Sequence, residues 1–226
     1  MKLTTDNLQP TTKNMNLKKI NPNLQKALIE NGLTEANEVQ QQTFSTIKSG
    51  ADAVVIAPIG AGKSTTIIIN VIQRMEKSVG ESTRVLIIVE NKERVIEMEE
   101  MFLKYATYHD LSILGVHDKG DFDYDKNIIS LGLDVLIGTP NRINAMFASA
   151  GFNISTIKMF AVDDADILFR IRMDAVVHRL SNSIDKAQRL FFTTDLTERV
   201  ESLADKIMIE PLFFEIDNEQ EDNNED

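Results

Sequence analysis

The residues from Pro58 to Thr65 form the pattern in this sequence that is best suited to chemistry. They read Pro-Ile-Gly-Ala-Gly-Lys-Ser-Thr and lie between a short apolar run, AVVIA at 53–57, and a segment of helical length. Glycines allow successive backbone N–H groups to turn toward an anion, and the N-terminus of the following helix favours negative charge. A lysine can then reach the outer phosphates of a nucleotide while a hydroxyl binds Mg²⁺. The pattern therefore predicts a phosphate-binding loop.

The roles within this loop follow from the residue types. The backbone cradles phosphate, Lys63 contacts the outer phosphates and takes part in catalysis, and Ser64 is a magnesium ligand. The predicted nucleotide-binding residues of the loop are Gly60, Ala61, Gly62, Lys63, Ser64 and Thr65. Ala57 stands where the common pattern has its first glycine. A glycine-rich turn without a ligand is the alternative, and the apolar run before the loop and the helix after it argue against that alternative.

A second chemical candidate is the acidic end of the apolar run at 157–162, where the sequence continues Asp163-Asp164-Ala165-Asp166. Phosphate-loop enzymes hold magnesium with a carboxylate at the end of a neighbouring strand, so Asp163 is predicted to be a catalytic magnesium ligand. Asp164 is predicted to orient or deprotonate an attacking water. An acidic turn or a helix cap is the alternative, and it loses weight beside the phosphate loop.

The elements that must position these residues alternate along the chain. Short β-rich apolar runs lie at 53–57, 84–89, 111–116, 134–138, 157–162 and 189–194. Segments of helical length lie at 63–77, 92–106, 141–150 and 171–184, and two earlier helices are expected, one after Asn21 and one over 37–48. This alternation predicts an α/β fold in which a mostly parallel sheet carries helices on both faces.

Length and charge favour one domain with two loose ends. The chain has 226 residues and a formal net charge of −11, and we expect one α/β domain at 17–214 after a flexible arm at 1–16. The segment 215–226 holds seven acidic residues and no basic one, which predicts a disordered acidic tail and leaves the rest of the chain at −4. This acidic balance argues against a protein that binds nucleic acid tightly without regard to sequence.

Several classes of site and location are excluded by composition. The absence of cysteine rules out a disulfide framework, a thiolate zinc site, an iron–sulfur cluster and a cysteine nucleophile. The apolar runs are far shorter than the roughly 20 residues that cross a bilayer, and nothing N-terminal resembles a signal peptide, so we expect a cytoplasmic protein without a membrane partner.

With these motifs in place, the chain resembles the first RecA-like domain of a DEAD-box RNA helicase from about Met15 to about Phe214. The box that names the family reads Asp-Asp-Ala-Asp at 163–166, and the family's Ser-Ala-Thr motif corresponds to Thr-Thr-Asp at 193–195. The resemblance implies a RecA-like phosphate-loop fold with ATP and Mg²⁺ as cofactors. It also implies that Gln40, at the end of an upstream segment, reads adenine, because one amide offers both the donor and the acceptor that the base requires.

The resemblance also implies that RNA and a second RecA-like domain or protein partner take part. The family's Pro-Thr-Arg-Glu-Leu-Ala segment corresponds to 90–95 and its Thr-Pro-Gly-Arg segment to 139–142, which makes Lys92, Thr139 and Arg142 the RNA-binding candidates. Asp164 replaces the family's glutamate and shortens the presumed base by one methylene. Weak or partner-dependent ATP hydrolysis, without unwinding by this chain alone, is therefore expected.

Two alternative functions stay open, beside the possibility that the sequence is a fragment of a longer helicase. The altered motifs are also compatible with an interaction module that kept the helicase fold and lost catalysis, acting through a protein partner. A small-molecule kinase would need a lid with arginines, for which only Arg170, Arg172 and Arg179 cluster, and it ranks last. The alternating carboxylates of Asp121–Asp125 resemble part of a calcium loop, but the glycine and the final glutamate are missing, so a solvated loop is predicted there.

Overall fold

The computed structural model describes residues 16–79 and 82–217. In these residues seven strands form one sheet in the order β3-β4-β2-β5-β6-β1-β7, and every neighbouring pair is parallel. The strands are β1 Ala53–Ile56, β2 Val85–Ile88, β3 Ile113–Val116, β4 Val135–Gly138, β5 Met159–Val162, β6 Gln188–Thr193 and β7 Leu212–Glu215. Parallel order places the carboxyl ends of all seven strands at the same edge, which is where ligands bind in open α/β sheets.

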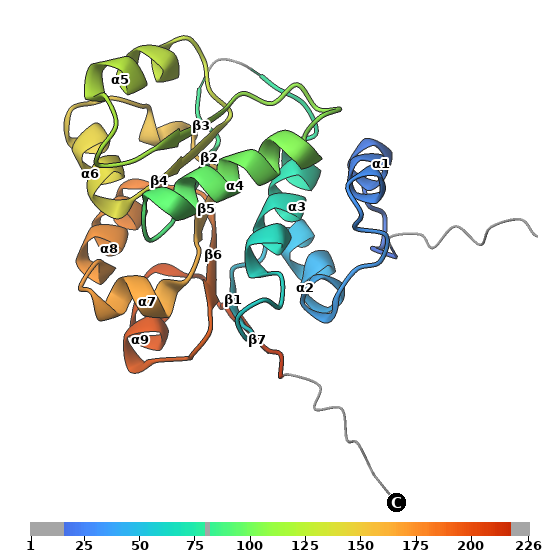
Figure 1. Cartoon of the computed structure of the whole chain (residues 1–226). Coiled ribbons are helices and arrows are strands. Elements are labelled where there is room, and N and C mark those ends of the chain that lie inside the picture. The colour runs from blue at the N-terminus through green and yellow to red at the C-terminus, as the bar shows by residue number, and fades with distance from the viewer. Residues whose placement is uncertain (1–15, 80–81, 218–226) are drawn as a thin grey trace, which may run out of the picture.

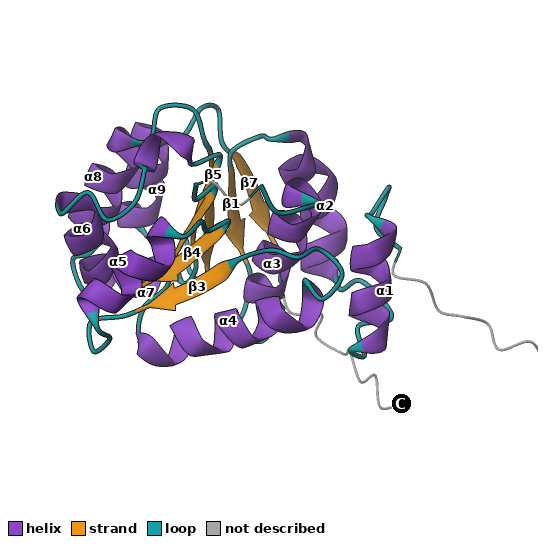
Figure 2. Ribbon diagram, turned by 90° about the horizontal axis from the view of Figure 1, so that it is seen from above, coloured by secondary structure: helices purple, strands orange, loops and turns teal. Residues whose placement is uncertain are grey.

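Helices cover both faces of this sheet, as Figures 1 and 2 show. One face carries α1 Pro22–Glu30, α2 Glu38–Ser49, α3 Lys63–Met75 and α4 Lys92–Tyr105. The other face carries α5 Phe122–Ser130, α6 Pro140–Ala148, α7 Ala165–Arg170, α8 Asp174–Ser183 and α9 Glu198–Ile207, and a short 3₁₀ turn, Ile154–Thr156, precedes β5. No helix in the described part of the chain is long and apolar enough to cross a membrane.

The core divides by strand alternation into two apolar layers. In β1, Ala53 and Val55 face the layer under α1–α4, whereas Val54 and Ile56 face the layer under α5–α9. All four residues are nearly or fully buried, because helices cover the strand on both sides. The continuous apolar character of these runs, rather than an alternating pattern, is therefore the consequence of a sheet without a solvent face.

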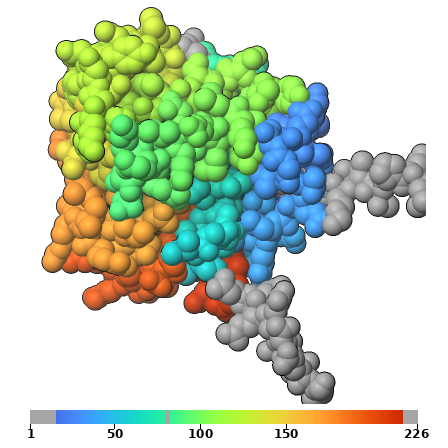
Figure 3. Space-filling model, viewed as in Figure 1, coloured from blue at the N-terminus to red at the C-terminus, as the bar shows by residue number. Residues whose placement is uncertain are grey.

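The N-terminal helix lies beside the C-terminal end of α4, where the space-filling view in Figure 3 shows the blue segment next to the green one. The Tyr108 hydroxyl donates to Glu30 at 2.7 Å, and the Lys26 ammonium lies 4.3 Å from the centre of the Tyr108 ring. The Asn31 amide donates to the Lys104 carbonyl at 3.4 Å. These contacts attach α1 to the helix whose first turn reaches the phosphate loop.

The predicted α/β fold and its six strands are confirmed, with ends that shift by one or two residues. Two expectations were wrong. The segment at Asp121 is not a solvated loop but the start of α5, because the Asp121 carboxylate caps the helix by accepting from the N–H groups of Asp123 and Tyr124 at 3.0 Å. The edge strand β7, paired with β1, extends to Glu215, so the sheet runs into the segment expected to be a disordered tail. The predicted arm and the rest of the tail lie almost wholly outside the described residues.

His109, just after α4, gives a prediction for stability. The residue is only 3% exposed, and neither ring nitrogen has a hydrogen-bond partner among the described residues. Burial lowers the pKa of His109 below its ordinary 6.5, although the charges of Asp110 and Glu76 act in the opposite direction. The unfolded chain therefore binds this proton first as the pH falls through 6.5, and the folded state loses stability there.

The variant His109→Leu is expected to reduce this acid destabilisation by up to about 1.4 kcal/mol per pH unit, the limit for one proton. Urea denaturation at pH 7.5 and pH 5.5 measures the difference between the two free energies of unfolding. His178, which is partly exposed, provides the matched control in His178→Leu. An equal pH dependence for wild type and His109→Leu would contradict the prediction.

Candidate nucleotide site

The phosphate loop connects the carboxyl end of β1 to the N-terminus of α3. Gly60 and Gly62 adopt φ values of +84° and +89°, which L side chains rarely tolerate. A Cβ at Gly62 would also approach the Asn37 amide nitrogen to 2.4 Å. Both glycines are therefore required by the backbone itself, and the loop places the first turn of α3, beginning at Lys63, toward the carboxyl edge of the sheet.

The N-terminus of α2 contacts this loop and hydrogen-bonds to it. Asn37 and Gln40 form a reciprocal capping box, in which the Gln40 amide oxygen accepts from the Asn37 N–H at 3.1 Å. The Asn37 side chain also donates to the Ala61 carbonyl at 2.9 Å. Gln40 is only 2% exposed, so its amide here fixes the helix start beside the loop. Its predicted role in reading adenine stays a prediction, and it requires the amide to become accessible.

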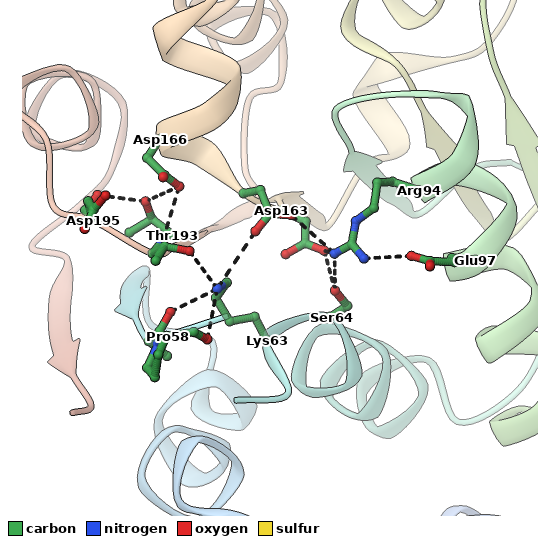
Figure 4. A network of polar contacts seen from close by, with 12 residues as sticks. Pro58, Lys63, Ser64, Arg94, Glu97, Asp163, Asp166, Thr193 and Asp195 are labelled. Carbon is green, nitrogen blue, oxygen red and sulfur yellow. Dashed lines mark hydrogen bonds and ion pairs between the residues drawn. The ribbon is translucent and has the colours of Figure 1, made fainter. Parts of the chain in front are cut away.

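Lys63 lies under the loop and is 6% exposed. Its ammonium donates to the Ala57 carbonyl at 2.9 Å, the Pro58 carbonyl at 3.3 Å and the Thr194 hydroxyl at 3.0 Å, and it lies 3.9 Å from Asp164 (Figure 4). These partners follow β1, β6 and β5, which are neighbours in the sheet. A buried cation held by carbonyls and a hydroxyl at the base of a loop rich in N–H groups is well placed to meet an anion.

Asp163 and Ser64 meet directly although 99 positions separate them. The Ser64 hydroxyl donates to Asp163 Oδ2 at 2.6 Å, and Asp163 Oδ1 is buried without a partner among the described residues. Burial first, and then the charge of Asp164, raise the pKa of Asp163 to about 6 against the opposing influence of Ser64, Arg94 and Lys63. The neighbouring donors and cations therefore do not fully offset the cost of burying the negative charge of Asp163, as expected of a carboxylate that can accept a further cation.

Arg94 is the residue that the sequence prediction missed. It lies in the first turn of α4, after β2, and one of its nitrogens, Nη2, lies 3.0 Å from Ser64 Oγ, 3.3 Å from Asp163 Oδ2 and 3.2 Å from Asp164 Oδ2. Its other nitrogen, Nη1, donates to Glu97 at 2.7 Å (Figure 4). Partial burial lowers the pKa of Arg94, but the two aspartates outweigh it and the pKa is raised overall. The one available signal was a basic residue in the helix turn after a neighbouring strand.

The remaining acidic residue of the box, Asp166, has a structural role: it connects the start of α7, just after β5, to the end of β6. Asp166 is buried and its Oδ1 accepts from the Thr193 hydroxyl at 2.8 Å and from the Thr194 N–H at 3.2 Å. This link ties the end of β5 to the end of β6, next to the Lys63 ammonium. Asp164 is the N-cap residue of α7 and has φ +51°, a left-handed conformation that Asp tolerates better than most residues.

The donor set fits a magnesium ion that is completed by other ligands. Ser64 Oγ and the Asp163 carboxylate are hard oxygens, and Asp163 Oδ1 is a buried acceptor that lacks a partner. No group of three or more His, Asp or Glu side chains that could hold a metal occurs among residues 16–79 and 82–217. A magnesium ion here would therefore need phosphate and water oxygens as well, which is how Mg²⁺ is usually held beside nucleotides.

A cavity of about 580 Å³ opens over the phosphate loop. It is lined by loop residues, by Asp164 and Thr194, and by one side of α4 including Arg94, Glu97, Glu100 and Lys104. Its volume lies within the range of small-molecule sites. Neighbouring strand ends β2, β5, β6 and β1 thus each bring a polar side chain to one cavity.

The RNA candidates are placed differently from what their motif implies. Arg142 is buried, donates through Nε and Nη2 to Asp125, and stacks 4.9 Å from the centre of the Phe122 ring. The Thr139 hydroxyl is buried and donates to Asp118 at 3.1 Å. Lys92 is half-buried at the start of α4. The structure therefore turns two of the three candidates onto carboxylates of the same chain.

Comparison with known proteins supplies the context for this site. The model of the DEAD/DEAH box helicase family matches residues 37–203. The chain is similar to an ATP-dependent RNA helicase eIF4A of Debaryomyces hansenii, with 24% identity over 212 residues that cover 92% of this chain and 51% of the relative. It is also similar to the DEAD-box ATP-dependent RNA helicase CshC of Bacillus cereus, with 23% identity, 88% of this chain and 51% of the relative.

Solved structures agree on the fold. A crystal structure of a DEAD box protein from the hyperthermophile Methanococcus jannaschii superimposes with a TM-score of 0.84 at 18% identity, covering 90% of this chain and 56% of that one. A hypothetical ATP-dependent RNA helicase from Sulfolobus tokodaii gives a TM-score of 0.76, also at 18% identity, covering 85% and 57%. The chain therefore spans about half the length of these proteins.

Proposed function

Because this chain belongs to the DEAD/DEAH box helicase family, we propose that it binds ATP with magnesium at the phosphate loop. The observation that carries the proposal is the direct contact between Ser64 and Asp163, with the Lys63 ammonium 3.9 Å from the adjacent Asp164. In this role the loop N–H groups and Lys63 bind the phosphates, and Ser64 and Asp163 hold the magnesium ion. Mg²⁺ bound with the nucleotide would offset charge on the β- and γ-phosphates.

We propose slow hydrolysis at this site. Asp164 lines the cavity and is the residue best placed to act as a general base, but the Arg94 guanidinium lies 3.2 Å from its Oδ2 and occupies that oxygen. Its side chain is also one methylene shorter than the family's glutamate, and small errors in the position of a base cost large factors in rate. A second RecA-like domain, on the same polypeptide or on a partner, is proposed to complete the site.

We propose that RNA contacts the same carboxyl edge of the sheet, with Lys92 as the principal candidate on this domain. Thr139 and Arg142 are engaged by Asp118 and Asp125, and Glu90 adds a negative charge near the path. Because nucleic-acid affinity depends mainly on cations at phosphates, binding by this domain alone should be weak and sensitive to salt.

Calorimetric titration of the full chain with ADP and ATP, each with and without MgCl₂, tests the proposal. We expect saturable binding that is stronger with magnesium. A rival function, an interaction module without nucleotide, is favoured by the arginine on the magnesium-binding oxygens and by the shortened Asp164. Absence of binding to either nucleotide in both conditions would reject the proposed function and favour the interaction module.

A further inference from the structure

The Arg94 guanidinium lies on the oxygens at which a magnesium ion would bind. Its Nη2 is the shared neighbour of Ser64 Oγ, Asp163 Oδ2 and Asp164 Oδ2, at 3.0 to 3.3 Å. Arg94, whose side chain is permanently charged, stands where the Pro-Thr-Arg-Glu-Leu-Ala segment of the resembled family has its leucine. Arg94 is therefore the cationic side chain nearest to the two aspartates in the described structure. Lys63 is more distant, at 3.9 Å from Asp164.

Two features hold Arg94 in this place. Its backbone N–H donates to the Asn91 side chain at 3.0 Å, which fixes the first turn of α4 at the end of β2. Its second nitrogen donates to Glu97 one turn later on the same helix. The Ser64 hydroxyl is also used twice, because it donates to Asp163 while it accepts from Arg94.

A magnesium ion and the guanidinium cannot share these oxygens. Mg²⁺ requires oxygen ligands at about 2.0–2.1 Å in near-ideal octahedral geometry. That geometry needs the Ser64 lone pair and the space beside Asp163 that Nη2 now takes. The side chain of Arg94 is one-third exposed, and Glu97 and Glu100 line the same cavity, so the guanidinium has carboxylates to move toward when it leaves.

On the premise of the proposed function, we propose that Arg94 competes with magnesium for the Ser64 hydroxyl and the Asp163 carboxylate. The arginine acts as an internal cation that sets how much Mg²⁺ the protein needs before it binds a nucleotide tightly. Binding without magnesium leaves Arg94 in place, whereas binding with magnesium requires it to move. Arg94 is thus a residue that determines the metal requirement and not a catalytic residue.

The variant Arg94→Leu tests this directly. Binding of ADP is measured over a series of MgCl₂ concentrations, and we expect the concentration for half-maximal magnesium effect to fall about tenfold in the variant. This magnitude corresponds to loss of one hydrogen bond to a charged group, about 1.5 kcal/mol. Arg199→Leu, which removes a partly exposed arginine paired with Asp174 on the other side of the sheet, is the matched control and should keep the wild-type value.

A second measurement does not depend on nucleotide. Thermal unfolding with MgCl₂ alone should show a rise in the melting temperature of Arg94→Leu that is larger than that of the wild type, because the two aspartates have lost their internal cation. Arg94→Gln keeps a polar side chain without the charge and should behave like Arg94→Leu. It also serves as the test if the leucine variant does not fold.

The outcomes separate this proposal from the proposed function. An unchanged magnesium requirement together with an unchanged thermal response would overturn the competition. Weaker ADP binding in Arg94→Leu to the same extent with and without magnesium would also overturn it, because Arg94 would then be a phosphate ligand. If no variant and no wild type binds ADP, the proposed function fails, while the magnesium-dependent thermal response still decides the competition.

Discussion

The variant Lys63→Ala is expected to lower the affinity for ATP by about 100-fold. The ammonium already lies at the base of the phosphate loop, where it is almost fully buried and has three donor contacts. When a nucleotide binds, charge-assisted hydrogen bonds from this nitrogen to phosphate oxygens are each worth about 1.5–3 kcal/mol, and two of them account for the expected factor.

Calorimetry with ATP and MgCl₂ measures the effect of Lys63→Ala. The matched control is Lys77→Ala, since Lys77 is an exposed lysine just beyond the other end of α3, and its affinity should stay within about twofold of wild type. Circular dichroism should show both variants folded. An ATP affinity of Lys63→Ala equal to that of Lys77→Ala would remove the phosphate loop from the proposed function.

The second large effect concerns stability. Arg142→Ala is expected to lower the free energy of unfolding by about 3–5 kcal/mol, because it leaves the buried Asp125 carboxylate without its cation. The substitution also removes the stacking of the guanidinium on the Phe122 ring. This expectation differs from the role implied by the Thr-Pro-Gly-Arg resemblance, in which the arginine would be free to contact RNA.

Urea denaturation at neutral pH measures the loss, and Arg199→Ala is the control. Arg199 pairs with Asp174 at 3.4 Å at a partly exposed position, so its removal should cost at most about 1 kcal/mol. The double variant Arg142→Leu with Asp125→Leu should recover most of the stability, because two apolar groups replace the pair. A loss below 1 kcal/mol in Arg142→Ala would show that the ion pair is not structural and would return Arg142 to the RNA candidates.

The sequence was informative about the phosphate loop because its geometry is local. Gly60 and Gly62 permit a backbone path that depends on neighbours in the chain, and Lys63 follows at a fixed spacing on the first helical turn. The position of Asp163 beside the loop was predictable for a related reason, because Asp163 is the first residue after a buried strand. The function of such positions depends on strand ends and helix starts, which residue patterns indicate well.

Arg94 and Arg142 were not predictable in the same way. The direction of Arg94 depends on β2 lying next to β5, a neighbour relation that no local pattern specifies. The assignment of Arg142 to RNA depended on a motif, whereas its partner in this structure, Asp125, lies on a helix that the sequence analysis had interpreted as a loop. Edge strand β7 was missed for a third reason, because its exposed Leu212 and Phe213 do not give the buried pattern of the inner strands.

The strand order has a consequence for the time at which the nucleotide site can form. Strand β1 carries the phosphate loop, yet its only ladders in the described structure are to β6 and β7, with Ala53 opposite Leu190 and Leu212. A nascent chain that has emerged as far as β5 therefore has β2 beside β4 and β5 but no neighbour for β1. Pairings so distant in sequence are slow to form. Closure of the sheet around β1 is thus a late event in folding, and the phosphate loop acquires its final shape only after most of the domain has been synthesised.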